Sequence, residues 1–118
     1  MYSRKVPNVK PMAWMGDSLT RLRAASADIR SDVGYELYQV QRGEAPADFK
    51  AMPDVGSGVI EIRVHADNEF RVFYVARFDE AIYVLHCFVK RSRKTPKADI
   101  DLGKKRYAAL LESRRKRT

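Results

Sequence analysis

The sequence is poor in cysteine: Cys87 is the single one among 118 residues. No disulfide can form within the chain, which excludes a disulfide-stabilised secreted scaffold. Long apolar runs are also missing, and none approaches the roughly 18 residues that a transmembrane helix needs. Residues 1–15 carry charges and lack the continuous apolar run of a secretory signal. We therefore expect a cytoplasmic protein that is not embedded in a membrane.

Motifs for nucleotides, nucleophilic serines and zinc are absent as well, since the sequence has no GxGxxG, P-loop, GxSxG or HExxH. It has two histidines, His65 and His86, and neighbouring residues such as His86 and Cys87 point to opposite faces of a strand. These residues do not have the spacing of a zinc site. A lone cysteine on a central strand is more often a small core residue than a nucleophile. We expect neither a metal nor a cofactor.

Positive charge is what the sequence has in excess. The 23 Lys and Arg outnumber the 15 Asp and Glu and give a formal net charge of +8. Residues 90–118 contain 12 basic and 3 acidic residues, whereas residues 1–89 contain 11 and 12. The excess lies in the last quarter of the chain, including a basic tail at about 113–118. This distribution favours a polyanion or an acidic protein surface as partner, although the tail would also suit a solvated helix C-terminus.

The length fits one domain, residues 1–118. Residues 1–15 are expected to be extended and to supply an edge strand. Periodicity predicts helices at about 17–29 and 32–42, a loop at 43–58 and strands at 59–64, 70–75 and 81–89. Asp17 or Ser18 would cap the first helix, and Thr95 and Pro96 would begin the last one. The order predicts an α+β fold: a small twisted antiparallel β-sheet with two N-terminal helices and one C-terminal helix, all packed on one face.

The hairpin predicts one relationship that can be checked. If residues 66–68 form its tip, Arg63 lies opposite Arg71 and Glu61 lies opposite Phe73, with both arginines on the same sheet face. Like charges directly opposite one another are unfavourable. A carboxylate such as that of Glu61 could offset them, or a phosphate could bind between the two guanidiniums. The sequence leaves both explanations open.

Several segments, taken in order, resemble one family. They are EIR at 61–63, FRVFY at 70–74 and LHCFVKRSRKTP at 85–96, with support from Trp14, GYEL at 34–37, VQRG at 40–43 and KKRY at 104–107. Together they resemble the phage-derived HigB-like branch of the RelE/ParE toxin superfamily over about residues 10–112. The sequence departs from the usual pattern at Cys87, Arg91 and Arg93, and Arg91 keeps the positive charge.

This resemblance implies a RelE-like fold and the toxin of a type II toxin–antitoxin module. Such toxins are metal-independent endoribonucleases that cut mRNA, usually on the translating ribosome, and so inhibit translation. The implied partners are mRNA, the ribosome and a cognate antitoxin that is typically a helix-turn-helix protein, with operator DNA bound only through the antitoxin complex. Two alternatives stay open: a ParE-like DNA gyrase inhibitor that acts by binding, and a non-catalytic module that binds nucleic acid or its antitoxin.

Metal-independent RNA cleavage needs a base for the 2′-OH, an acid for the leaving 5′ oxygen and cations that stabilise the negative charge on the phosphate. Arginines suit the third role, and a histidine titrates near neutral pH unaided. The expected catalytic residues are Arg71, His86, Arg63 and Lys90. His65 is the alternative to His86 for proton transfer, and Tyr74, like Lys90, is a lesser candidate for it. Strand parity points Tyr74 away from Arg71, toward the helices. The expected RNA-binding residues are Arg91, Arg93, Lys94 and Lys97, whose phosphate contacts would weaken as salt rises.

Overall fold

The computed structural model describes residues 9–117. Residues 1–8 and 118 lie outside the described residues, and with them part of the expected extended segment and the last residue of the basic tail. The elements are β1 (Met12–Trp14), α1 (Ser18–Arg23), α2 (Ala27–Gln41), β2 (Phe49–Ala51), β3 (Val59–His65), β4 (Glu69–Val75), β5 (Ile82–Val89) and α3 (Lys97–Arg117). This order confirms the expected α+β fold class, with two N-terminal helices and one C-terminal helix.

The strands form one five-stranded sheet in the order β1-β5-β4-β3-β2. Strands β2 to β5 are antiparallel, and the short edge strand β1 runs parallel to β5. The expected edge strand is therefore present, although the sheet is mixed rather than purely antiparallel. Strand β2 was not expected, because the prolines and glycines around it predicted a loop over 43–58.

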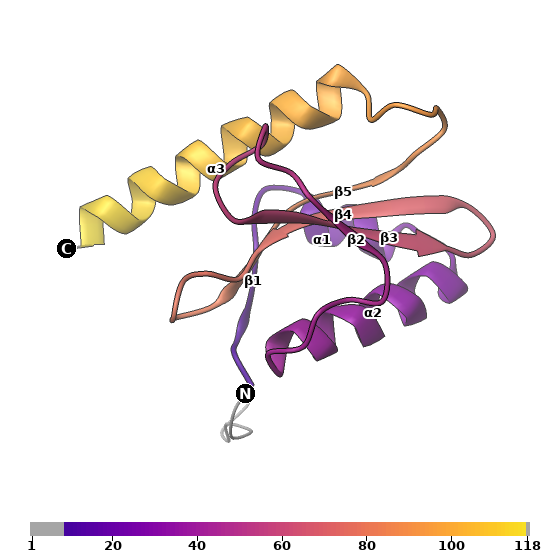
Figure 1. Cartoon of the computed structure of the whole chain (residues 1–118), viewed down its shortest axis with the longest axis horizontal. Coiled ribbons are helices and arrows are strands. Elements are labelled where there is room, and N and C mark those ends of the chain that lie inside the picture. Colours follow the sequence, from indigo (N-terminus) through magenta and orange to yellow (C-terminus); the bar gives the residue numbers. More distant parts are fainter. Residues whose placement is uncertain (1–8, 118) are drawn as a thin grey trace.

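The helices cover both faces of the sheet, as Figure 1 shows, so the expectation that they share one face is wrong. One core joins α1 and α2 to the sheet through residues such as Leu22, Val33, Leu37 and Val72. The apolar seam of α3 packs on the other face, and the second core contains Phe73, Leu85, Phe88, Tyr107 and Leu110. Aromatic residues on this face need cover from water, and α3 provides it.

The first helix is shorter than expected, because the chain breaks at Ala24–Ser26 rather than at Arg30–Ser31. Ser26 caps α2: its Oγ accepts a hydrogen bond from the Ile29 N–H at 3.2 Å. Asp17 stands before α1 without a side-chain capping bond. Ile29 therefore belongs to the apolar stripe of α2, whereas the pattern predicts that it ends the first helix.

A β-bulge in β5 decides which side chains reach the face under α3. Phe73 pairs with His86, whereas Tyr74 pairs with Val84, so Leu85 is the extra residue. Leu85 belongs to the core under α3, and the His86 ring lies 6.1 Å from that of Phe73. Two consecutive residues thus face α3, after which Cys87 joins the core under α1 and α2.

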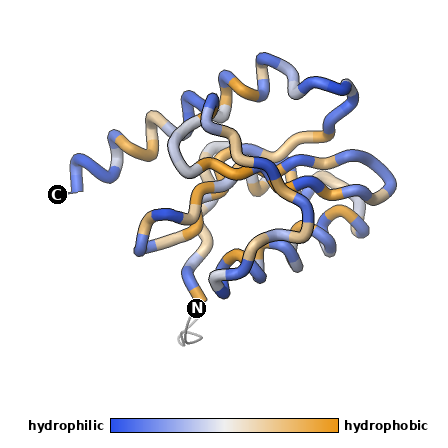
Figure 2. The backbone as a smooth tube through the Cα atoms, in the orientation of Figure 1, coloured by the Kyte–Doolittle hydropathy of each residue, from blue (hydrophilic) through white to orange (hydrophobic). Residues whose placement is uncertain are grey.

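Hydrophilic residues gather at the ends of this framework. Figure 2 shows the apolar backbone in the sheet and hydrophilic stretches at the β3–β4 turn, in the segment after β5 and at the far end of α3. Within residues 9–117, none of the helices is long and apolar enough to cross a membrane.

Candidate functional site

Arg63 and Arg71 are direct partners in the β3–β4 ladder, and Glu61 pairs with Phe73. The expected register is therefore confirmed, with the turn at 66–68 between His65 and Glu69. The two arginines do not share one anion. Arg63 Nε donates to Glu61 Oε1 at 3.3 Å, whereas Arg71 NH1 lies 3.1 Å from Glu69 Oε1. Each guanidinium thus has its own carboxylate, which offsets the repulsion expected from the pairing.

Arg71 is the most unusual of the predicted site residues because it is a buried cation. Its side chain is 7% exposed, although arginine is rarely buried without a partner. NH1 also donates to the carbonyl oxygen of Phe70 at 3.1 Å, but Nε is buried and has no hydrogen-bond partner among the described residues. A buried donor without an acceptor costs about 1–3 kcal/mol, so such groups call for an explanation.

Arg71 opens into a surface cleft of about 300 Å³. We call it the Arg71 cleft; its lining residues are Glu69, Arg71, Lys90, Arg91, Ser92 and Arg93. It lies where β5 ends beside the start of β4, and the Lys90 N–H donates to the Glu69 carbonyl oxygen at 2.7 Å. Lys90 Nζ also donates to the Arg93 carbonyl oxygen at 2.7 Å, which folds the segment after β5 around the cleft. Four cations against one carboxylate make this cleft suited to an anion.

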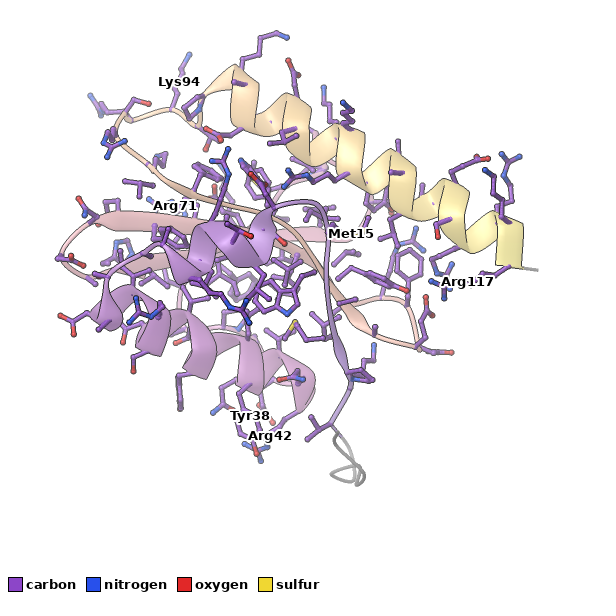
Figure 3. The ribbon with its side chains drawn as sticks, turned by 180° about the vertical axis from the view of Figure 1, so that it is seen from behind. Met15, Tyr38, Arg42, Arg71, Lys94 and Arg117 are labelled. Atoms are coloured by element: carbon purple, nitrogen blue, oxygen red, sulfur yellow. The ribbon has the colours of Figure 1, made fainter. Side chains whose placement is uncertain are left out.

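Three of the predicted Lys and Arg residues lie outside the Arg71 cleft. Arg63 is paired with Glu61 and lines a different cleft, together with Tyr35 and Asp48. Lys94 is exposed, and Figure 3 shows it at the same end of the molecule as Arg71. Lys97 is 87% exposed and bonds Asp101 at 2.7 Å within α3. The last two residues can extend the positive surface beyond the cleft without lining it.

His86 is fully buried under α3, so its imidazole cannot touch a substrate at the surface. Nε2 lies 2.7 Å from Asp99 Oδ1, and Nδ1 has no hydrogen-bond partner among the described residues. The ring stacks on Phe88 with centroids 5.0 Å apart. Burial lowers the pKa of His86, against the opposing effect of Asp99. The geometry places His86 in the contact between β5 and α3, apart from the Arg71 cleft.

Tyr74 and Cys87 lie on the α2 side of the sheet, in the core opposite Arg71, as strand parity predicted. Burial raises the pKa of Tyr74 and that of the Cys87 thiol to about 12 each. Neither side chain reaches the Arg71 cleft, and both stay protonated at neutral pH.

Glu69 and Ser92 line the cleft without having been expected there, and Glu69 is the charged one of the two. Its carboxylate contacts Arg71 and also His65, whose Nδ1 is 2.8 Å from Oε1 and 2.9 Å from Oε2. The second ring nitrogen of His65 lies 2.6 Å from Asp48 Oδ2. These bonds raise the pKa of His65 and, with Arg71, lower that of Glu69. Strand parity was a usable signal, because residues 69 and 71 share a face of β4.

No three His, Cys, Asp or Glu side chains within residues 9–117 are grouped so that they could hold a metal ion. The Arg71 cleft itself is lined by four cations, one carboxylate and one hydroxyl. Such a set can bind a phosphate, stabilise added negative charge on it and accept a proton.

Comparison with known proteins identifies the family. The family model described as "Phage derived protein Gp49-like (DUF891)" matches residues 20–108, which include the whole Arg71 cleft and strands β2 to β5. A comparison with curated proteins found no match. The chain therefore belongs to the Gp49-like phage-derived family, a RelE/HigB-like toxin family associated with toxin–antitoxin systems.

Proposed function

We propose that this protein is the toxin of a toxin–antitoxin module and cuts mRNA on the translating ribosome without a metal ion. The observation that carries the proposal is the buried Arg71 guanidinium, which stands with an unpaired Nε at a cleft lined by Lys90, Arg91 and Arg93. A phosphate in the cleft would pair with the guanidinium, and the cations around it would supply the countercharge. The family supports the toxin part of this proposal.

The reaction that fits the cleft is attack of a ribose 2′ oxygen on the adjacent 3′ phosphate. The 2′ oxygen bonds to phosphorus as it loses its proton, the bond to the 5′ oxygen breaks, and that oxygen takes up a proton. The products are a 2′,3′-cyclic phosphate and a 5′-hydroxyl end. Arg71 would hold the phosphate and stabilise its added charge, an effect worth about 10²–10³-fold for one well-placed donor. Lys90 is the one lysine that lines the cleft, and its ammonium could protonate the leaving oxygen.

Binding to longer RNA would use the exposed cations next to the cleft. Arg91 and Arg93 line it, while Lys94 and Lys97 lie on the same segment and at the start of α3. Such contacts are strongly salt-dependent and hold a phosphate backbone without reading its sequence. We propose that they orient the toxin on the ribosome and its mRNA.

The antitoxin implied by the family would keep the toxin inactive in the cytoplasm. A basic cleft is complementary to an acidic segment, which could cover it and exclude RNA. We propose a helix-turn-helix antitoxin, through which the pair would bind operator DNA.

The test is to induce the chain in growing cells and follow the incorporation of a labelled amino acid, with primer extension on a translated message. We expect incorporation to stop quickly and new 5′ ends to map within the reading frame. Arg71→Ala should abolish both effects. Arg42→Ala is the matched control, because Arg42 projects from α2 far from Arg71 (Figure 3) and should stay fully toxic. Continued translation with filamentation would contradict the proposal and favour a gyrase inhibitor.

A further inference from the structure

The Arg71 cleft contains a single group that can take up a proton at neutral pH. Of its six lining residues, four are cations and Ser92 donates its hydroxyl to the Lys94 carbonyl oxygen at 2.7 Å. Lysine and arginine side chains are protonated at neutral pH and cannot serve as bases unless their pKa falls far. Glu69 is the remaining group. A carboxylate in a cleft suited to anions weakens the binding of phosphate, so its presence calls for a reason.

Glu69 is placed where a base for this reaction must be. The 2′ oxygen attacks the phosphorus of the neighbouring phosphate, so the base must stand beside the cation that holds that phosphate. Glu69 Oε1 lies 3.1 Å from Arg71 NH1. A phosphate bound to Arg71 would therefore bring the adjacent ribose within reach of the same carboxylate.

The Glu69 carboxylate is also held in position from behind. His65 Nδ1 contacts both of its oxygens at 2.8 and 2.9 Å, and His65 is in turn bonded to Asp48 at 2.6 Å. The side chain is nevertheless 45% exposed, which leaves it open to an incoming ribose. Because His65 and Arg71 lower the pKa of Glu69, it is ionised at neutral pH and ready to accept a proton.

We infer that Glu69 is the general base that removes the proton from the attacking 2′-OH in the Arg71 cleft. The proton moves from the 2′ oxygen to a Glu69 oxygen as the 2′ oxygen bonds to phosphorus, and the 5′ oxygen leaves with a proton from Lys90 or water. This inference rests on the proposed nuclease function. It assigns Glu69 a different task from Arg71: Arg71 binds and stabilises the phosphate, whereas Glu69 acts in cleavage alone.

The test separates binding from cleavage in the purified full chain. Glu69→Gln keeps the shape of the side chain and removes the proton acceptor. We expect its single-turnover cleavage of ribosome-bound mRNA to fall about 10²-fold, near the low end for a general base because a lowered pKa makes a weaker base. Its affinity for an RNA with a 2′-O-methyl group at the cut site should stay equal or rise, because a negative charge has been removed. Glu44→Gln, which changes an exposed carboxylate outside the cleft, should cleave like the wild type.

A second variant gives a readout that a purely structural role would not move. Glu69→Ala should regain at least tenfold in cleavage rate when formate or acetate is added, because a small carboxylate can fill the space and take the proton. Cleavage by Glu69→Gln within threefold of the wild type would overturn the base assignment and leave the nuclease function standing. Loss of RNA affinity in Glu69→Gln, or no rescue of Glu69→Ala, would also overturn it. A wild-type chain that makes no cuts would remove the proposed function itself, and the base assignment with it.

Discussion

Arg63 and Arg71 lie directly opposite each other across β3 and β4, and each guanidinium meets a different carboxylate. Arg63 is bonded to Glu61, which is 2% exposed and also lies 3.5 Å from the Thr95 hydroxyl, so this arginine is tied into the sheet. Arg71 is bonded to Glu69 at the rim of a cleft and keeps one donor unpaired. Arg63 is thus held within the sheet, whereas Arg71 lines the cleft.

The salt dependence of RNA binding should show which cations of the cleft contact phosphates. Each cation that neutralises a phosphate adds about 1 to the slope of log affinity against log salt. We expect Lys90→Ala and Arg91→Ala each to lower that slope by about 1 and to weaken binding equally for unrelated sequences. Lys50→Ala, on the exposed strand β2, is the control and should leave the slope unchanged. The measurement is fluorescence anisotropy of a labelled RNA from low to moderate salt, and equal slopes for all three variants would contradict the prediction.

Two glycines in helices should respond to alanine in opposite directions. A Cβ on Gly103 would lie 2.9 Å from a ring carbon of Phe73 and 3.0 Å from Val55, both in the core under α3. We expect Gly103→Ala to lower the free energy of unfolding by about 1–2 kcal/mol, because overpacking outweighs the better helix propensity. A Cβ on Gly34 would meet nothing within 4 Å, so Gly34→Ala should raise it by about 1 kcal/mol. Urea unfolding of both variants measures these changes in the free energy of unfolding. A stabilised Gly103→Ala variant would contradict the prediction and show that α3 packs less tightly against Phe73 and Val55.

His86 and His65 should make the free energy of unfolding depend on pH in opposite directions. Burial lowers the pKa of His86, so the folded chain binds its proton less readily than the unfolded chain. The contribution of His86 is present above the unfolded pKa of 6.5 and is lost as pH falls toward the folded value. Asp48 and Glu69 raise the pKa of His65, so its contribution is present below 6.5 and is lost as pH rises through the folded value.

The measurement is the urea midpoint between pH 5 and 8, a range above the titration of most carboxyl groups. In His86→Gln, the urea midpoint should fall less between neutral pH and pH 5 than it does in the wild type. In His65→Gln, the urea midpoint should fall more over the same range, because the variant lacks the histidine whose protonation stabilises the folded chain. Parallel profiles for the two variants would contradict the assigned environments.

Cys87 should be unreactive in the folded protein. The side chain is fully buried in the core under α1 and α2, and burial raises the pKa of its thiol to about 12. We expect one equivalent of thiol to react with an aromatic disulfide reagent in urea, and negligible reaction in native buffer over the same time. Rapid labelling of the native chain would show that this core opens.

Local patterns were sufficient for the antiparallel ladder and the last helix. The register of β3 and β4 followed from the alternation of Ile60, Ile62 and Val64 and from a short polar turn, because a slip by one residue would expose the whole apolar set. The last helix was predicted near Thr95 and Pro96 and begins at Lys97, since proline suits a helix start. These features depend on neighbours in sequence.

Features that depend on tertiary contact were missed. The sequence places Gly103 in the apolar seam of α3 but does not show which face of the sheet this seam covers, because that depends on contacts with residues distant in sequence such as Phe73. The bulge at Leu85 could not be read from alternation, so it was not expected that Leu85 would join the core under α3 beside His86. The cations of the site were expected, but the carboxylate considered beside them was that of Glu61, whereas the one bonded to Arg71 belongs to Glu69.

The most direct test of the account is single-turnover cleavage of ribosome-bound mRNA by the purified Arg71→Ala variant, with circular dichroism and urea unfolding to verify the fold. Arg71 is the buried cation that faces the cleft with an unpaired donor. We expect a rate about 10²–10³-fold below the wild type, with only a small recovery in Arg71→Lys, since lysine cannot bind phosphate bidentately. A folded Arg71→Ala variant that cuts within threefold of the wild-type rate would contradict this expectation.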